Sequence, residues 1–300
     1  TINRSDFIIK YLYYLDFMNF NGQILLGDSS DKFHFDETSN FIFKNKLSFS
    51  CEHIHCPNMT NFQAIRTVIP LIKFDYTMFV CDDDILVVET LKKCMDFLDN
   101  NKEYSSVGGF GVCVVLKNIT YESIKYIFKY RVSEISQDKS YERVTSLMNN
   151  YSVVNYALTR TPEFKERWPI DNKLNTTEFA TELLPCAIAA AQGKIKMLDD
   201  LFVVRQIHDR RYLLPNIIDQ IVNQNWLDSL NLSIDYTAKI ISKKDEIDTN
   251  FSRKYSKKAW KLYIQNSVKS FTKKKERNII KYYLDAFVAK VKCYILLKRI

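Results

Sequence analysis

The segment that decides the fold runs YTMFVCDDDILVV over residues 76–88. An apolar run ends there in Asp82, Asp83 and Asp84, and a second apolar run follows the acids. Adjacent carboxylates repel one another and are costly inside an apolar segment unless a cation compensates them. Oxygen ligands of this kind suit Mg²⁺ or Mn²⁺, ions that also contact substrate phosphates. The pattern predicts a strand that ends at a divalent-metal site, with a solvated acidic turn as the alternative.

The flanking segments alternate between helical and strand-like patterns. Residues 5–20 carry apolar side chains at helical spacing, and residues 23–27 form a short apolar run that ends in Asp28. Residues 61–72 again read as a helix, which leads into the expected strand over 76–81. This alternation predicts an α/β fold with a mostly parallel sheet flanked by helices. The acids would then lie in the crevice where open α/β sheets bind ligands.

Five short stretches stand out in this order along the chain: TINRS (1–5), GQILLGDSS (22–30), CDDD (81–84), ELLP (182–185) and VVRQIH (203–208). Together they resemble nucleotide-sugar glycosyltransferases of the GT-A type, close to family 2, in a bacterial and archaeal subgroup. The resemblance covers about residues 1–226. Each stretch alone is weakly specific, and their combination is more so.

The resemblance implies a GT-A, Rossmann-like fold and metal-dependent transfer of a sugar from a nucleotide-diphosphate sugar to a glycan or lipid-linked acceptor, with inversion. Mn²⁺ or Mg²⁺ would neutralise the departing diphosphate. Asp84 is then the principal metal ligand, and Asp82 and His208 are further ligands. A purely structural histidine is the alternative for His208.

The remaining donor contacts are implied for residues at the strand ends and for three later arginines. Guanidinium groups pair with phosphate in a bidentate manner, although such arginines are also common as surface charge. The residues concerned are Thr1, Arg4, Asp28, Ser29, Asp82, Asp83, Arg205, Arg210 and Arg211.

The acceptor hydroxyl must lose its proton as it attacks, and a nearby carboxylate can take that proton. The resemblance points to Glu182, on an expected helix over 176–192. Glu178 lies one helical turn earlier and is the alternative base. An exposed helix residue with no catalytic role is the simpler interpretation of either.

Two other function classes remain open. A nucleotidyltransferase acting on a sugar phosphate also suits an α/β sheet with acids at a strand end, but the chain, with only six glycines, lacks a Gly-rich phosphate loop. A binding module that keeps the fold without activity is the other alternative.

Residues 51–56 (CEHIHC) contain four potential zinc ligands, yet no second ligand pair accompanies them, so an ordinary strand is favoured.

Basic charge is concentrated at the C-terminus. Residues 251–300 carry 15 Lys and Arg against 2 Asp and Glu, whereas residues 1–250 carry 28 against 33. Apolar residues interleaved with lysine at helical spacing are typical of basic amphipathic helices, which can lie on an anionic membrane. A helical appendage packed on the catalytic domain is the alternative, and no nucleic-acid module is recognisable. We therefore expect a GT-A domain over 1–228 and a helical basic extension over 229–300.

The sequence also predicts a compartment. It has no apolar run long enough for a membrane span and no visible leader peptide, and its seven cysteines are scattered. These features predict a cytoplasmic protein, with peripheral attachment to the inner membrane face as a further expectation.

In GT-A enzymes a first strand precedes a Thr-x-Asn-Arg element, so we expect the chain to be an N-terminally truncated fragment.

Overall fold

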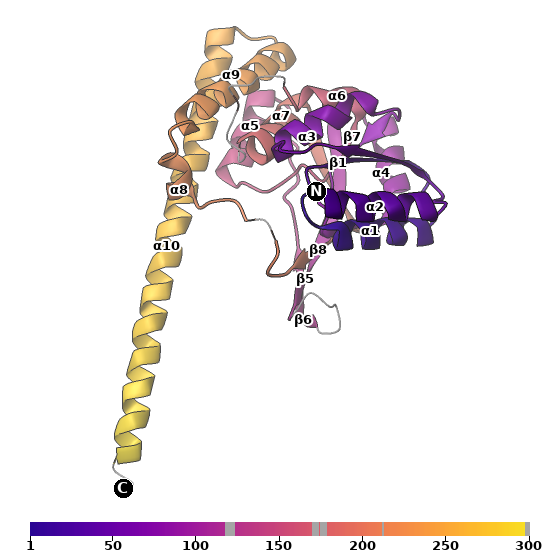
Figure 1. The fold of residues 1–300 in the computed structure, drawn as a ribbon. Coiled ribbons are helices and arrows are strands. Elements are labelled where there is room, and N and C mark those ends of the chain that lie inside the picture. Colours follow the sequence, from indigo (N-terminus) through magenta and orange to yellow (C-terminus); the bar gives the residue numbers. More distant parts are fainter. Residues whose placement is uncertain (118–123, 170–173, 175–178, 212, 298–300) are drawn as a thin grey trace.

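The computed structural model describes residues 1–117, 124–169, 174, 179–211 and 213–297 (Figure 1). Helices and strands alternate from α1 to β8, and helices alone follow. The elements are α1 (Ser5–Phe17), β1 (Gln23–Asp28), α2 (Lys32–Lys44), β2 (Ser50–His55), α3 (Asn61–Val68), the 3-10 turn η1 (Ile69–Leu71), β3 (Tyr76–Thr77), β4 (Asp84–Leu86), α4 (Val88–Asn100), β5 (Tyr104–Leu116), β6 (Ile124–Tyr130), α5 (Ser140–Asn149), β7 (Leu158–Arg160), α6 (Thr161–Glu166), the π-helical turn η2 (Phe179–Leu183), α7 (Leu184–Gln192), β8 (Lys194–Ile207), α8 (Ile217–Ile221), α9 (Trp226–Asp245) and α10 (Thr249–Leu297).

The main sheet has six strands in the order β3-β7-β5-β8-β4, and β6 pairs with β5. The long strands β5 and β8 run parallel, whereas every other pairing in this sheet is antiparallel. Strands β1 and β2 form a separate parallel pair. The predicted α/β class with C-terminal helices is confirmed. The expected mostly parallel arrangement is corrected to a mixed sheet, because a hairpin strand and several strands of two or three residues add antiparallel edges.

The largest buried cluster surrounds α7, whose residues are all buried. This helix is rich in alanine, and its small side chains let α5 and α9 approach closely. Val144 and Leu147 of α5 and Ile241 of α9 belong to the same cluster. The C-terminal helices therefore share one core with the helices beside the sheet.

The helix α10 has two parts with different surroundings. Its first part packs on α5 and α9, where Ala259 and Trp260 are completely buried. Its later part extends away from the body (Figure 1). None of the described helices combines the length and apolar character that a bilayer crossing requires. The predicted domain boundary at residue 228 falls inside α9, and the division itself stays a prediction.

Candidate active site

The three acids occupy the turn between β3 and β4. The side chains of Asp82, Asp83 and Asp84 are 12%, 8% and 4% exposed. Of the strand expected over 76–81, only Tyr76–Thr77 pairs regularly, and Asp84 then opens β4. Buried carboxylates this close together require positive charge or hydrogen-bond donors around them.

Arg4 and Thr1 bring the N-terminal segment to this turn. Arg4 Nη1 donates to Asp82 Oδ1 at 2.9 Å and to Asp83 Oδ2 at 3.2 Å. The Thr1 hydroxyl donates to Asp82 Oδ2 at 2.6 Å, and the Ser29 amide donates to the Thr1 carbonyl at 3.0 Å. Five of the residues that the sequence assigns to the nucleotide thus meet in one place.

His208 lies beside Asp83. Its Nε2 is 3.2 Å from Asp83 Oδ2, and its ring stacks on Phe7 of α1 with the centroids 4.7 Å apart. The His208 side chain is 1% exposed, and its Nδ1 has no hydrogen-bond partner among the described residues. The structure therefore pairs the predicted histidine ligand with the middle acid of the three.

Asp84 is surrounded by donors. Asp84 Oδ2 accepts hydrogen bonds from the Tyr156 hydroxyl at 2.7 Å and from Arg205 Nε at 3.2 Å. Asp84 Oδ1 accepts from the Gln206 amide at 3.3 Å. Burial raises the pKa of Asp84, although Arg205 and Tyr156 oppose that rise. Tyr156 belongs to no recognisable motif, so the sequence analysis did not identify it. That Asp84 is the principal metal ligand remains a prediction.

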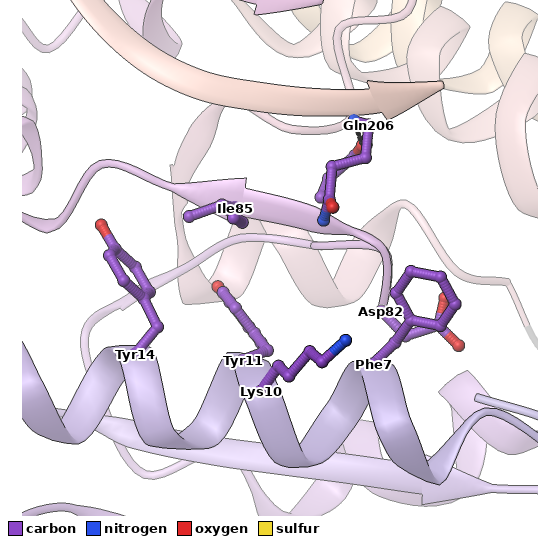
Figure 2. Close-up of a pocket in the computed structure, with 8 residues that line it drawn as sticks. Phe7, Lys10, Tyr11, Tyr14, Asp82, Ile85 and Gln206 are labelled. Carbon is purple, nitrogen blue, oxygen red and sulfur yellow. Dashed lines mark hydrogen bonds between the residues drawn. The ribbon is translucent and has the colours of Figure 1, made fainter. Parts of the chain in front are cut away.

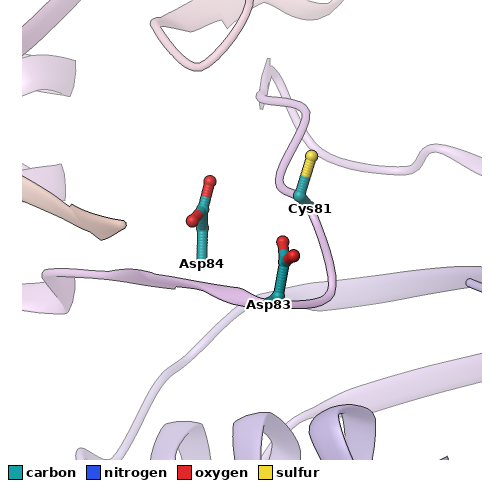
Figure 3. Close-up of side chains that lie close together, drawn as sticks. All are labelled: Cys81, Asp83 and Asp84. Atoms are coloured by element: carbon teal, nitrogen blue, oxygen red, sulfur yellow. The ribbon is translucent and has the colours of Figure 1, made fainter. Parts of the chain in front are cut away.

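Cys81 lies close to two of the acids. Its Sγ and one oxygen each from Asp83 and Asp84 all lie within 4.8 Å of one another. Figure 3 shows the three side chains rising from the same side of the turn. Carboxylate oxygens and an adjacent imidazole fit a divalent ion such as Mn²⁺ or Mg²⁺, and these are the residues that would hold it.

A cavity of about 190 Å³ opens between α1 and β4 beside the acids. Figure 2 shows Phe7, Tyr11 and Tyr14 along the side of α1 that faces Ile85 of β4. Asp82, Asp84, Gln206 and Lys10 supply polar groups to the same cavity. A cavity with apolar walls and a few convergent polar groups is typical of a ligand site.

Asp28 faces inward at the end of β1. Its Oδ2 is 2.8 Å from His53 Nε2, and its Oδ1 accepts from the Ser30 amide at 2.9 Å. Burial would raise the pKa of Asp28, but the hydrogen bonds from His53 and Ser30 outweigh it and lower that pKa. His53 Nδ1 lies 3.0 Å from the Ser39 hydroxyl. His53 of β2 therefore holds Asp28, the residue predicted to contact the nucleotide. Among the described residues, the side chains of β2 form no cluster of metal ligands.

The three later arginines have different partners. Arg205 lies against Asp84 and over the rings of Tyr130 and Tyr156. Arg210 forms an ion pair with Asp6 of α1 at 2.8 Å. The Arg211 amide donates to the His208 carbonyl at 3.3 Å. Only Arg205 contacts the acids directly among these three.

Glu182 lies in the π-helical turn η2, next to the core. Its Oε1 accepts from the Tyr151 hydroxyl at 3.2 Å. Burial raises the pKa of Glu182, while Tyr151 and Arg205 act in the opposite direction. Arg205 therefore lies within electrostatic reach of both Glu182 and Asp84. Glu178, the alternative base, lies outside the described residues.

No protein-family model matches the chain, and no curated protein matches it significantly. Among solved structures, the chain is similar to crystal structures of Staphylococcus aureus TarS residues 1–349. The first of these is 14% identical, with a TM-score of 0.46, and the similarity covers 90% of this chain and 89% of that one. The complex of TarS 1–349 with UDP-GlcNAc is likewise 14% identical, with a TM-score of 0.46 over 89% of each chain.

Proposed function

We propose that this chain is a metal-dependent glycosyltransferase that moves a sugar from a nucleotide-diphosphate sugar to a glycan or lipid-linked acceptor. The observation that carries the proposal is the buried acidic turn, on which Arg4 converges from the N-terminal segment and Arg205 and His208 from the end of β8. A site that gathers carboxylates with an imidazole and guanidiniums beside a cavity suits a diphosphate and its counter-ion.

The residues of the site would perform three tasks. Asp82, Asp83, Asp84 and His208 would hold Mn²⁺ or Mg²⁺, which supplies Lewis-acid stabilisation of the leaving diphosphate when bound. Thr1, Arg4, Asp28 and Ser29 would hold the nucleoside side of the donor. Arg205, with Arg210 and Arg211, would bind the diphosphate oxygens.

Glu182 is the proposed general base, and Glu178 is the alternative. A single inverting displacement needs one base, which removes the acceptor hydroxyl proton as the sugar is transferred. The raised pKa of Glu182 supports this assignment, because a buried carboxylate accepts a proton more readily than an exposed one.

The proposed setting is cytoplasmic, with the basic end of α10 at an anionic membrane that would carry a lipid-linked acceptor. The support is the charge asymmetry of the chain and the extension of α10 beyond the body. Positively charged segments of this kind are attracted to anionic lipid headgroups.

The test measures the thermal stability of the full chain with Mn²⁺ alone, with a panel of nucleotide-diphosphate sugars alone, and with both. A ligand that binds only the folded state raises its melting temperature. We expect one donor class to stabilise the chain only with the ion present, and then to release its nucleotide when an acceptor is added.

The variant Asp83→Asn should lose the ion-dependent stabilisation, whereas Asp96→Asn, at an exposed position of α4, should behave as the unmodified chain. Release of pyrophosphate from a nucleoside triphosphate and a sugar phosphate would instead establish a nucleotidyltransferase. Stabilisation without any turnover across a broad acceptor panel would leave a binding module.

A further inference from the structure

We propose that Cys81 Sγ is itself a ligand of the ion at the acidic turn, so that the site favours a transition-metal ion over Mg²⁺. The inference rests on the proposed function, because it concerns the same metal site. It assigns a chemical role to a cysteine that the proposed function leaves without one.

The geometry of the turn carries the proposal. Cys81 Sγ lies within 4.8 Å of oxygens from both Asp83 and Asp84 (Figure 3). Sulfur and oxygen ligands on one tetrahedral ion lie roughly 3.5 Å apart, given the usual bond lengths to zinc. The three ligand atoms are therefore close enough together to approach one ion.

His208 lies beside the same turn, next to Asp83. Its Nε2 lies 3.2 Å from Asp83, and the side chain is almost completely buried. Its Nδ1 is buried and has no hydrogen-bond partner in the part of the chain that the structure describes. Nε2, the nitrogen that faces Asp83, is the one that could turn to an ion at the acids.

The charges at the turn also call for a cation. Asp82, Asp83 and Asp84 contribute three carboxylates, and the guanidiniums that contact them come from Arg4 and Arg205. One negative charge is left over if all three acids are ionised, and burial makes an uncompensated charge expensive. A divalent ion bound there would remove this excess.

The ligand set determines which ion is preferred. Mg²⁺ favours oxygen ligands and octahedral geometry, whereas sulfur and imidazole favour Zn²⁺ and related transition-metal ions. A site with one sulfur and two carboxylates, and with an imidazole beside Asp83, should therefore bind Zn²⁺ and Cd²⁺ more tightly than Mg²⁺. The alternative is that Cys81 only fills space beside Tyr156.

The test measures ion binding to the full chain without a nucleotide sugar, by calorimetry with Mg²⁺, Mn²⁺, Zn²⁺ and Cd²⁺. Sulfur-to-metal charge-transfer absorption with Cd²⁺ is the second readout. We expect Cys81→Ser to weaken Zn²⁺ and Cd²⁺ binding by about 10- to 100-fold, the usual cost of disturbing a metal site. The same variant should leave Mg²⁺ binding within about threefold and should lose the absorption band.

Cys94→Ser is the matched control, because Cys94 of α4 is a buried free cysteine in a core cluster without the acids. It should change neither affinity nor absorption. If Cys81→Ser folds poorly by circular dichroism, Cys81→Ala provides the same comparison with a small apolar side chain. An absorption band that survives in the Cys81 variants, or that the unmodified chain never shows, overturns the proposal.

Asp83→Asn separates this inference from the proposed function. Loss of every ion in Asp83→Asn, together with an unchanged ion preference in Cys81→Ser, would reject the sulfur ligand and keep the metal site. Unchanged binding of every ion in Asp83→Asn would reject the metal site itself, and with it the metal-dependent reaction.

Discussion

Glu182 is a carboxyl group whose surroundings favour its protonated form. Because burial raises its pKa, the base becomes active only above a pH higher than the usual glutamate range near 4.3. We expect the acidic limb of the rate profile to lie above that range. Glu182→Gln should cut transfer by about 10²–10⁴-fold, the usual effect of losing a general base, and should leave donor binding intact. Initial rates across pH and donor titrations measure both.

Tyr151→Phe is the matched comparison, since it removes only the hydroxyl that donates to Glu182. This change should move the acidic limb to higher pH, because a hydrogen bond to the ionised form lowers a pKa. If Glu182→Gln keeps full glycosyl-transfer activity and Glu178→Gln loses most of it, the general base is Glu178 and not Glu182.

Arg167 is a buried arginine whose direct partners are neutral. Its Nε donates to Gln192 Oε1 at 2.9 Å, and its two Nη atoms donate to the Thr159 and Ser106 hydroxyls at 2.9 and 2.7 Å. Lysine keeps the charge but cannot reach three separate acceptors. Arg167→Lys should therefore lower the free energy of unfolding by about 2–4 kcal/mol.

Urea unfolding measures this loss, and Arg253→Lys serves as the control. Arg253 forms a half-exposed ion pair with Asp235, so its replacement should change stability by less than about 0.5 kcal/mol. Equal effects of the two substitutions would mean that the Arg167 network adds no stability beyond a surface ion pair.

Residue chemistry identified the acids but did not determine how they pair. Spacing along the chain says nothing about whether His208 meets Asp83 or Asp84, because the contact depends on where β8 ends beside β4. Tyr156 was missed for the same reason: its contact with Asp84 spans 72 residues and has no local pattern. Only the folded chain defines these partners.

At the scale of elements, one carboxylate links the C-terminal helices to the middle of the chain. Asp245, the last residue of α9, accepts from the Ser140 and Tyr141 amides at 2.7 and 3.0 Å, at the N-terminus of α5. These amides have no partner within their own helix, and the helix dipole favours a negative charge there. Asp245→Ala should lower the free energy of unfolding by about 1–2 kcal/mol.

Asp235→Ala on the same helix is the control, because Asp235 forms a half-exposed ion pair with Arg253. Thermal unfolding of both variants tests the assignment. A loss that is no larger for Asp245→Ala than for Asp235→Ala would show that the cap contributes nothing measurable.

The sequence predicted elements well where the hydrophobic pattern was regular. The helix α1 and the strand β1 lie where the apolar residues place them. The prediction was wrong for most of 76–81, where only Tyr76–Thr77 pair as β3 and residues 78–81 form no regular strand. Apolar content shows burial but does not show whether a neighbouring strand is available to pair, and pairing direction in the sheet is equally non-local.

At the scale of the whole molecule, the C-terminal extension has two parts with different surroundings. The first part of α10 belongs to the core, since Trp260 is fully buried beside Phe179, with ring centroids 5.5 Å apart. The later part runs beyond the body (Figure 1). Residues 274–300 carry 8 Lys and Arg against 2 Asp and Glu. Packing thus accounts for the start of the helix, and membrane contact remains a prediction for its end.

Two truncations separate these roles. Ending the chain after residue 273 should leave the melting temperature nearly unchanged and should abolish binding to anionic vesicles. Ending it after residue 250 should destabilise the whole protein, because it removes Trp260 from the core, and a buried tryptophan alone contributes about 3–5 kcal/mol. Co-sedimentation with neutral and anionic lipid, at low and high salt, measures the first effect, and thermal unfolding measures the second.

A full-length variant with the basic residues of 274–300 replaced by glutamine distinguishes charge from length. Each basic residue near an anionic surface contributes roughly 1 kcal/mol, and salt screens this attraction. The glutamine variant should therefore lose vesicle binding as completely as the shorter chain does. If the unmodified chain does not bind anionic vesicles at low salt, the membrane role is wrong and the end of α10 is a structural arm. Vesicle binding that survives in the glutamine variant would instead point to the apolar side chains of this segment.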